Sequence, residues 1–322
     1  MTTKDNILKL LINNSDYLSG EEMAKIIGVS RNAIWKNINS LIEDGIKIDS
    51  KANKGYKLAQ SIHFLDKVVI DNYLGDDFYK TIVFDSLSST STYLKNHVSE
   101  YDEGTVVFAR EQINGRGRLD RSFYSPKDTG IYFSILVKPH ISINKTVYLT
   151  VLSAVSVNEA ILEELGIDLG IKWINDLYKD DKKVCGILAE GAINIDYNYL
   201  DYCVIGIGIN ILKPKDGFLD LEDKATFITS NDCDLNKIAS AILKKFKKHY
   251  LELLEGNLSF VNTYIEKQIL IGKQVEVLNL YNDTKYNADV IGVSSDCMLE
   301  VKKENGKIEL LNSGEVRIII NK

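Results

Sequence analysis

The apolar residues of this 322-residue chain change their spacing along the sequence, and this change limits the possible folds. In residues 4–45 they recur every three or four positions, which is the period of a helix with one buried face. Further on, continuous apolar runs are separated by longer helical stretches, and from residue 271 short alternating segments typical of strands predominate. We therefore predict three domains of different class, namely residues 1–63, 64–270 and 271–322.

The first domain contains the signals of two short helices joined by a glycine turn. Ser19 and Glu22 have the spacing of a capping box, and Gly28 is suited to end that helix. Ser30 is suited to cap a second helix, which Gly45 would close. In the second helix, the apolar residues that we expect to face inward are Ile34, Ile38, Leu41 and Ile42. This arrangement is typical of a helix-turn-helix, whose second helix enters the major groove of DNA.

A basic hairpin follows the second helix. Residues 46–58 alternate like a strand, break at residues 52–55 and then resume, as in the wing of a winged helix-turn-helix. The residues that we expect to contact DNA, at phosphates or base edges, are Arg31, Asn32, Trp35, Lys36, Lys51 and Lys54. The alternative is a small helical domain that docks a protein. The segment resembles the winged helix-turn-helix domains of bacterial regulators, and DNA binding is the interpretation that we favour.

The composition excludes several other classes of protein. The net charge is −6, although residues 1–60 carry nine Lys and Arg against seven Asp and Glu. The four cysteines lie far apart, without the close pairs of a zinc site or a disulfide framework. The four histidines are equally scattered, and no apolar run is long enough to span a membrane. We therefore expect a soluble cytoplasmic protein with no membrane partner.

The central domain combines strand-like runs with two long helical segments. The runs that predict strands are residues 81–84, 105–110, 130–137, 170–178, 182–192 and 202–211. Residues 146–165 and 235–256 predict the helices. Strands outnumber helices and do not alternate strictly with them, so we expect an α+β domain with a mixed sheet rather than a doubly wound one.

Residues 112–124, QINGRGRLDRSFY, are the most unusual segment of this domain. The segment lacks the Lys-Ser/Thr pair of a P-loop and the third glycine of a dinucleotide-binding motif. Gly115 and Gly117 would free backbone N–H groups to form an anion-binding concavity. Arg116 and Arg118 would add bidentate donors for a phosphate or a carboxylate. A surface turn or a nucleic-acid contact is the alternative that the pattern leaves open.

Two further segments support a ligand site. We expect a strand hairpin that brings Asp176, at the end of one strand, close to Lys183, at the start of the next. Asp176 would then hold a magnesium ion or orient a polar ligand, and Lys183 would contact a phosphoryl or acyl oxygen. An ordinary Asp–Lys pair is the alternative. Ser89, Thr90 and Ser91 cluster at a predicted helix start, where hydroxyls either cap the helix or bind the polar end of a ligand.

These segments occur together, and in this order, in one known family. The chain resembles the bifunctional biotin protein ligases that also repress biotin operons. The resemblance covers essentially the whole chain and rests on the motifs SSTSTYLK, EQINGRGRLDRSF, KWINDLY, KKVCGIL and GIGIN. It implies that the chain joins biotin to ATP, releasing pyrophosphate, and passes biotin from biotinyl-5′-adenylate to a lysine of a biotin carboxyl carrier domain. It also implies that the adenylate-bound protein represses biotin genes as a homodimer on operator DNA.

The resemblance further implies a role for each motif residue, with Mg²⁺ as the metal. The biotin-binding residues would be Ser89, Thr90, Ser91, Gln112, Arg116, Gly117, Arg118 and Lys183. The ATP-binding residues would be Arg116, Arg118, Arg121, Phe123, Asn175, Asp176, Lys183, Asn210 and Arg317, with Asp176 at the metal. Lys183, Arg118 and Arg116 would be catalytic, because cations offset the repulsion between a carboxylate and a phosphate. The chain departs from the family pattern at Ser91, Ile174 and Phe123, where Asn, Pro and Trp are frequent.

Residues 271–322 are strand-rich and predict a small SH3-like barrel. Asn305–Gly306 predicts a two-residue hairpin turn within it. By the resemblance this domain packs near the nucleotide, which would bring Arg317 close to ATP. We expect dimer contacts from the central sheet and the arginine loop. Two other functions remain open, a non-catalytic biotin-sensing regulator and a lipoate ligase of the same fold.

Overall fold

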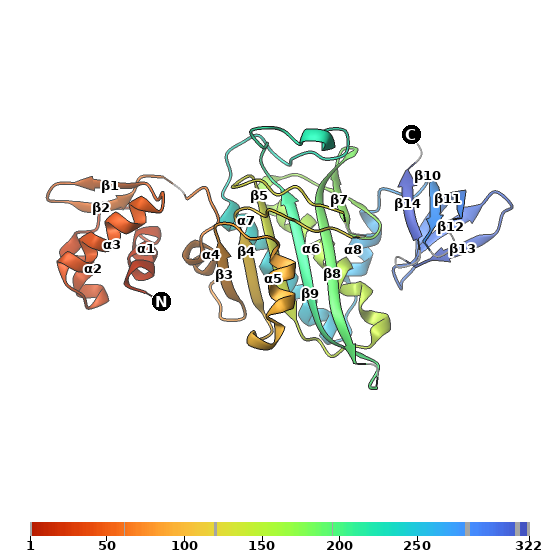
Figure 1. Cartoon of the computed structure of the whole chain (residues 1–322), viewed down its shortest axis with the longest axis horizontal. Coiled ribbons are helices and arrows are strands. Elements are labelled where there is room, and N and C mark those ends of the chain that lie inside the picture. Colours follow the sequence, from red (N-terminus) through yellow and green to blue (C-terminus); the bar gives the residue numbers. More distant parts are fainter. Residues whose placement is uncertain are drawn as a thin grey trace.

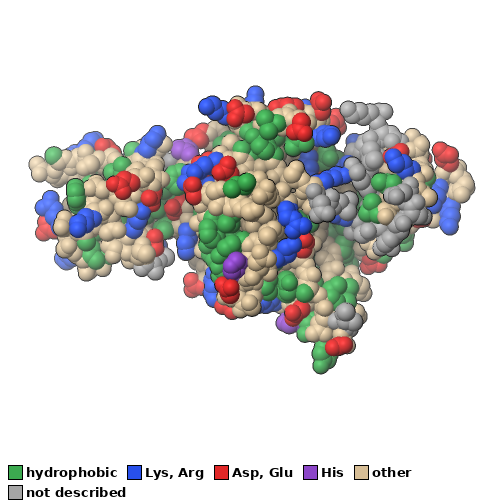
Figure 2. All heavy atoms as spheres, viewed as in Figure 1, with side chains coloured by type: hydrophobic (Ala, Val, Ile, Leu, Met, Phe, Trp, Pro, Cys, Tyr) green, Lys and Arg blue, Asp and Glu red, His purple; other side chains and the backbone are tan. Residues whose placement is uncertain are grey.

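A computed structural model of the chain describes residues 2–60, 62–118, 121–194, 196–280, 284–312 and 316–320, the last of these segments by its backbone. Three domains follow one another along the longest axis of the molecule (Figure 1). Using the division predicted above, we call residues 1–63 the N-terminal domain, residues 64–270 the central domain and residues 271–322 the C-terminal domain. Figure 2 shows acidic and basic side chains intermixed over the visible faces of the N-terminal and central domains.

The N-terminal domain has the winged helix-turn-helix architecture that its sequence predicts. Side-chain caps begin both helices of the motif, since Ser19 Oγ accepts from the Glu22 N–H and Ser30 Oγ accepts from the Ala33 N–H. Gly28 ends the first of these helices at a φ of 79°, a conformation that favours glycine. The elements are α1 (Thr3–Ile12), α2 (Gly20–Ile27), α3 (Arg31–Glu43) and the antiparallel wing strands β1 (Ile48–Lys51) and β2 (Gly55–Leu58).

The buried face of α3 is narrower than the sequence predicts. Ile34, Ile38 and Leu41 are buried as expected. The prediction for Ile42 was wrong, because its side chain is 46% exposed. Adjacent residues of a helix point about 100° apart, so that Leu41 takes the inward position and Ile42 turns to solvent.

The central domain is built on one mixed sheet, which confirms the α+β prediction. Its strands lie in the order β3-β4-β5-β9-β8-β7-β6. β3 and β4 are parallel, whereas the other neighbouring strands are antiparallel. The strands are β3 (Lys80–Phe84), β4 (Thr105–Ala109), β5 (Gly130–Val137), β6 (Gly170–Lys172), β7 (Asp176–Lys179), β8 (Lys182–Asn194) and β9 (Tyr199–Asn210).

One predicted strand is in fact a hairpin. Residues 170–178 form β6 and most of β7, which pair antiparallel across a short turn. Asp176 therefore opens β7 instead of ending a strand, and Lys183 lies in β8, the next strand of the sheet. The turn was not recognised because two of its three residues, Trp173 and Ile174, are apolar and buried like strand residues, and only Asn175 gives a turn signal.

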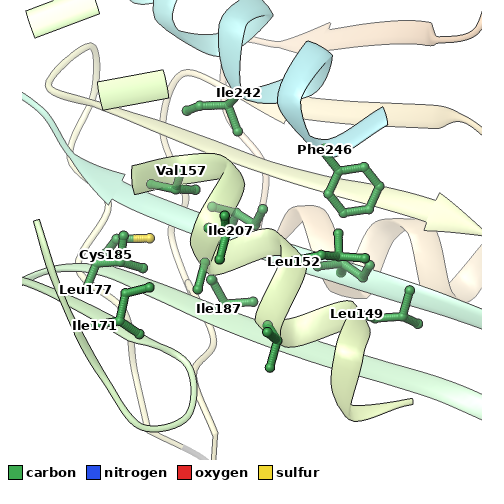
Figure 3. Close-up of a cluster of buried hydrophobic side chains, with 14 of the residues drawn as sticks. Leu149, Leu152, Val157, Ile171, Leu177, Cys185, Ile187, Ile207, Ile242 and Phe246 are labelled. Carbon is green, nitrogen blue, oxygen red and sulfur yellow. The ribbon is translucent and has the colours of Figure 1, made fainter. Parts of the chain in front are cut away.

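Helices cover both faces of this sheet. α6 (Val147–Leu165) and α7 (Leu235–Leu254) pack on one face, where their apolar side chains meet those of β7, β8 and β9 (Figure 3). α5 (Thr90–Asn96) packs on the other face, where Leu94 joins a small buried cluster. No helix among the described residues combines the length and the apolar character that crossing a membrane requires. The remaining helices are α4 (Lys67–Leu74), α8 (Phe260–Glu266) and the short 3-10 helices η1 (Val98–Glu100), η2 (Ile143–Lys145) and η3 (Leu219–Leu221).

The C-terminal domain is a five-stranded antiparallel sheet, consistent with the predicted SH3-like barrel. The turn before the strand at residues 308–311 consists of residues 304–306, because the Lys303 N–H donates to the Lys307 carbonyl. The prediction of a two-residue turn was wrong, since only Gly306 of the pair Asn305–Gly306 has a positive φ and a type I′ turn needs both. The strands, in the spatial order β13-β12-β11-β10-β14, are β10 (Gln274–Asn279), β11 (Lys285–Val293), β12 (Leu299–Lys303), β13 (Ile308–Leu311) and β14 (Val316–Ile320).

The C-terminal domain is joined to the central domain near the β6–β7 turn. The indole N–H of Trp173 donates to the carbonyl of Cys297 at 2.8 Å. Both residues are buried. This bond ties the β6–β7 turn, which contains Asn175 and is followed by Asp176, to the C-terminal domain.

Candidate active site

A cavity on the same face of the central sheet as α5 gathers most of the predicted site residues. Its open space is ≈ 40 Å³, because the ring of Phe123 lies against Gly186 and Gly208 within it. The predicted residues that line it are Ser89, Thr90, Ser91, Gln112, Arg116, Gly117, Arg118, Phe123, Asn175 and Lys183. The hydroxyl segment, the arginine loop and the β7–β8 hairpin therefore meet at one place.

The floor of the cavity is a cluster of hydroxyl groups at the start of α5. Ser89 is the N-cap of this helix. The hydroxyls of Thr90 and Ser91 lie 2.8 and 2.9 Å from Ser134 Oγ in β5. The side-chain oxygen of Gln112 accepts from the Thr90 N–H at 2.9 Å. All four hydroxyl residues are buried, so a ligand would meet donors and acceptors that the protein already holds in position.

Two glycines of β9 make room for these side chains. A Cβ atom at Gly206 would lie 2.3 Å from Ser91 Oγ. A Cβ atom at Gly208 would lie 2.6 Å from the ring of Phe123. Because successive residues of a strand face opposite sides, alternate glycines leave one face of β9 bare. The hydroxyl cluster and the aromatic ring occupy that face.

The arginine loop is an extended, hairpin-like segment rather than a concavity of free backbone N–H groups. Neither Gly115 nor Gly117 has a positive φ, and the Gly117 N–H donates to the Arg121 carbonyl at 2.7 Å. The prediction of a free N–H at Gly117 was therefore wrong, because pairing within the loop uses this donor. Gly115 is needed for close approach, since a Cβ there would lie 2.3 Å from the carbonyl oxygen of Phe123.

Side chains of the β6–β7 turn and of β7 hold two cations at the cavity. Arg118 donates from Nη1 to Asn175 Oδ1 at 3.2 Å, and Asn175 Nδ2 donates to the Ile187 carbonyl at 2.8 Å. Lys183 Nζ donates to Asp176 Oδ1 at 2.6 Å, so the expected approach of these residues is confirmed. Burial lowers the pKa of the Arg118 guanidinium, and the Asp176 carboxylate opposes this shift. The guanidinium remains charged at neutral pH.

The segment after β9 is tied to the backbone of Lys183. The Lys183 N–H donates to the Lys224 carbonyl at 3.0 Å, and the Thr226 N–H donates to the Lys183 carbonyl at 2.9 Å. Asn210, which is buried, donates from its side-chain amide to the Thr226 carbonyl at 3.1 Å. The residues that follow β9 therefore hold the backbone of Lys183 in position.

Three predicted ATP-binding residues whose side chains the structure describes do not line the cavity, namely Asp176, Asn210 and Arg121. Asp176 does not line the cavity itself, but it is bonded to Lys183, which does. Asn210 is engaged by the segment after β9, and Arg121 is exposed on the loop. The side chain of Arg317, in β14, lies outside the described part of the structure.

A larger cleft of ≈ 660 Å³ adjoins the cavity between the central and C-terminal domains. The start of α6, the second half of β8 and residues 296–298 of the C-terminal domain line it. The residues that line both the cavity and the cleft are Arg118, Asn175, Ile187 and Leu188. Of the cations of the cavity, Arg118 is thus reached from the side of the C-terminal domain.

The strands contribute site residues to which the sequence analysis assigned no role, although three of them lie in the motifs KKVCGIL and GIGIN. Ser134 bonds the hydroxyl cluster, and Gly186, Gly206 and Gly208 line the cavity. A signal for them is present in the sequence, because Gly206 and Gly208 alternate within an apolar strand and Ser134 interrupts another. A polar or missing side chain at a core position of a strand marks a close approach.

The residues predicted to contact DNA are exposed on the N-terminal domain. Four of them lie in the first half of α3, where Trp35 is 53% exposed. The other two are in or beside the turn of the wing, where the ammonium group of Lys51 lies 4.8 Å from the ring centroid of Tyr17. The exposed residues are Arg31, Asn32, Trp35, Lys36, Lys51 and Lys54.

Comparisons with known proteins agree with each domain. The model of the biotin/lipoate A/B protein ligase family matches residues 83–210. The model of an HTH domain matches residues 3–57, and that of the biotin protein ligase C terminal domain matches residues 270–318. The three matches follow the order of the three domains.

Individual relatives extend the match over the whole chain. The bifunctional ligase/repressor BirA of Bacillus spizizenii is 30% identical over 98% of this chain and 99% of its own length. That of Escherichia coli is 30% identical over 78% of this chain and 79% of its own. The structure of biotin protein ligase from Aquifex aeolicus in complex with biotin and ATP superimposes with a TM-score of 0.64 at 28% identity, covering 75% of this chain and 99% of that chain. The chain therefore belongs to the family of bifunctional biotin protein ligases and repressors.

Proposed function

We propose that the cavity described above is where this biotin protein ligase joins biotin to ATP. A carboxylate oxygen of biotin attacks the α-phosphorus of ATP, so that biotinyl-5′-adenylate forms and pyrophosphate leaves. The amine of a carrier lysine then attacks the acyl carbon, an amide forms and AMP leaves. The observation that carries this proposal is that Arg116, Arg118 and Lys183 line one cavity whose floor is a hydroxyl cluster.

The hydroxyl cluster is suited to the ureido group of biotin, which presents two N–H donors and one carbonyl acceptor. Ser89, Thr90, Ser91 and Gln112 supply both donors and acceptors. Ser91 stands where the family often has Asn, and Ser134 provides a further hydroxyl directly behind it. The hydroxyls of Ser91 and Ser134 would together supply the hydrogen bonding that the longer Asn side chain supplies elsewhere in the family.

The charged end of the cavity is suited to the reaction itself. Biotin carboxylate and the α-phosphate repel each other, and Arg116, Arg118 and Lys183 offset this repulsion. The bonds to Asn175 and Asp176 hold two of these cations before the substrates arrive, so little reorganisation is needed during the reaction. Gly117 and the rest of the loop would then cover the labile adenylate and exclude water.

ATP would lie between the cavity and the cleft, with Arg121, Phe123, Asn210 and Arg317 around it. Mg²⁺ usually takes one or two carboxylates, and its other ligands are waters and substrate phosphates. Asp176, with a side chain that is 25% exposed beside Lys183, fits this requirement. Among the described residues no group of three His, Cys, Asp or Glu side chains forms a metal site. A bound Mg²⁺ would neutralise phosphate charge.

The carrier domain would deliver its lysine through the cleft. The cleft adjoins the cavity at Arg118 and Asn175, where the acyl carbon would lie. Its volume of ≈ 660 Å³ is ample for one extended lysine side chain. Pyrophosphate would leave by the same side before the lysine enters.

Repression would use the N-terminal domain and a homodimer. Lys51 and Lys54 would contact phosphates, while Arg31, Asn32, Trp35 and Lys36 would face the major groove. β7 pairs with β8 as far as Gly186, so the outer edge of β8 from Leu188 to Asn194 has no strand partner among the described residues. An unpaired strand edge is suited to pair with a second copy. We infer that bound adenylate favours this dimer on a palindromic operator.

Incubation of the full-length protein with radiolabelled ATP, biotin and a biotin carboxyl carrier domain tests the ligase mechanism. We expect biotin-dependent adenylate and a labelled carrier lysine. Lipoate in place of biotin should give neither product. A protein that binds biotin but forms no adenylate would be a sensor only, and a preference for lipoate would contradict the assignment of the hydroxyl cluster.

A further inference from the structure

The two ends of the arginine loop are joined by one side chain outside the ligand cavity. Arg110 precedes the loop and Asp128 follows it. Arg110 donates from Nε to Asp128 Oδ1 at 2.8 Å and from Nη2 to Asp128 Oδ2 at 2.6 Å. The Asp128 N–H returns a bond to the Arg110 carbonyl at 3.0 Å. A third contact, from Nη1 to Asp85 at 3.0 Å, ties the same guanidinium to the end of β3.

The free face of this guanidinium lies on an aromatic ring that belongs to the domain junction. The central carbon of the Arg110 guanidinium is 4.1 Å from the ring centroid of Phe64. Phe64 packs against the buried cluster of the N-terminal domain. A Cβ atom at Gly45, just after α3, would lie 3.8 Å from the same ring. Phe64 therefore lies beside Gly45, which follows the helix predicted to read DNA, and it contacts Arg110 at the base of the loop predicted to cover the adenylate.

The backbone around Phe64 is hydrogen-bonded to α7 on one side, and a cavity borders the ring on the other side. The side-chain amide of Asn236, in α7, donates to the carbonyls of Ile62 and Phe64 at 3.2 and 2.9 Å and accepts from the Asp66 N–H at 2.8 Å. Asn236 is fully buried. Facing the N-terminal domain, a cavity of ≈ 170 Å³ borders the ring and is lined by Gly45, Ile46, Lys47, Gln60, Ile62 and His63. The ring thus has a fixed anchor and space to move toward α3.

We propose that Arg110 is a positioning residue that couples the arginine loop to the N-terminal domain through the ring of Phe64. A shift of the loop stems moves the guanidinium, and the cation–π contact transmits the shift to Phe64 and the end of α3. The coupling is reciprocal, so the placement of the N-terminal domain also biases the loop. The proposal rests on the proposed function, because it requires the loop to order over bound adenylate.

Amide hydrogen exchange of the full-length protein, with and without biotin plus ATP, tests this coupling. We expect ligand to slow exchange about five-fold or more in residues 112–128 and also in residues 43–58. Phe64→Leu should keep the first effect and lose the second, since leucine fills the apolar space without presenting a π face. Phe64→Tyr should retain both effects.

A matched control removes an unrelated ring. Phe78→Leu deletes a ring beneath Lys247 at 4.9 Å within the central domain, and both effects should remain. Slowing of both segments in Phe64→Leu would overturn the coupling while leaving the ligase mechanism intact. Absence of any slowing in residues 112–128 of the unmodified protein would overturn the proposed lid and this coupling with it.

Discussion

At the scale of single residues, the site pairs its cations with acceptors fixed in the sheet. Arg118 is bonded to Asn175, whose amide is bonded in turn to the backbone of β8. Lys183 is bonded to Asp176 across the β7–β8 ladder. The acceptors of both cations are therefore held by the sheet, and Lys183 itself lies in a strand, whereas Arg118 belongs to the arginine loop. This arrangement makes each residue's contribution separable by substitution.

Lys183→Gln removes the charge of Lys183 and keeps a polar side chain. We expect biotin-dependent pyrophosphate release to fall about 100-fold or more, because a group that stabilises transition-state charge contributes that much. Lys182→Gln is the matched control, since Lys182 is the preceding residue of β8 and its ammonium donates to the Glu222 carbonyl at the surface. Equal losses in the two variants would contradict a catalytic role for Lys183.

A methyl group at Gly206 tests the fit between β9 and the hydroxyl cluster. The new Cβ atom would lie 2.3 Å from Ser91 Oγ, so the Ser91 hydroxyl must rotate away from its bond with Ser134 or the start of α5 must shift. We expect the KM for biotin to rise about 10-fold in Gly206→Ala with a smaller change in kcat. In a Ser91→Ala background no hydroxyl remains to clash, so adding Gly206→Ala there should raise the KM much less than it does beside Ser91. The same rise of about 10-fold in both backgrounds would argue against a steric cause.

At the scale of elements, one buried histidine joins the two long helices under the sheet. His249 of α7 bonds Glu159 of α6 through Nε2 at 3.1 Å and Glu252 through Nδ1 at 2.9 Å. Burial alone lowers the pKa of His249, but the bonds to the two carboxylates outweigh it and the pKa is raised above its ordinary 6.5. The protonated imidazole is therefore favoured by folding.

The stability that His249 contributes should depend on pH in a defined direction. Because its pKa is raised in the folded state, the contribution is complete below pH 6.5 and is lost as the pH rises through the folded value. We expect His249→Gln to lower the Tm by about 5 °C at pH 6 and by less at pH 9. Scanning calorimetry of both proteins measures the difference. A difference that grows with pH would show that the neutral ring is the stabilising form.

The elements also show which parts of a fold a sequence can predict. α6 and α7 were found within two residues of their ends because their helical period and terminal glycines are local signals. The β6–β7 hairpin was missed because Trp173 and Ile174 are buried, and the partner of Trp173 is Cys297 of the C-terminal domain, a contact between distant segments. The pairing that occupies the Gly117 N–H is likewise a property of the folded loop. Local patterns cannot indicate such contacts.

At the scale of the whole molecule, β8, an inner strand of the central sheet, extends beyond its pairing with β7 and leaves part of its outer edge open. β8 is longer than β7, and Ile193 near its end is 48% exposed. The arginine loop also exposes an apolar residue, Ile113, which is 71% exposed. The proposed dimer would use this strand edge, together with the loop once adenylate has ordered it.

A charge on the open edge of β8 should weaken the proposed dimer. We expect Ile193→Lys to raise the dissociation constant of the ligand-bound dimer about 10-fold, because like charges meet across a two-fold axis. Sedimentation velocity in the presence of biotin and ATP measures the association. Ile308→Lys is the control, since Ile308 is equally an exposed isoleucine, 59% exposed, on the edge strand β13 of the C-terminal sheet. Equal association in both variants would exclude the β8 edge.

The residues of the candidate site could be predicted where they lie in sequence motifs with distinctive side chains, but not where they lie within the strands of the sheet. The loop, the hydroxyl segment and the Asp176–Lys183 pair were found from side-chain chemistry. Ser134 and Gly206 were missed because their role is to leave space or to bond a neighbour that is distant in sequence. Their importance becomes visible only when β5 and β9 are paired.

The two tryptophans lie in different environments, so the intrinsic fluorescence of the protein reports on two of its regions. Trp35 is 53% exposed on α3, whereas Trp173 is 7% exposed beside Asn175. An indole in water emits at longer wavelength than a buried one, and a dissolved quencher such as iodide reaches only the exposed ring. Operator binding and ligand binding can therefore be followed separately in one unlabelled sample, by the red and blue parts of its intrinsic fluorescence.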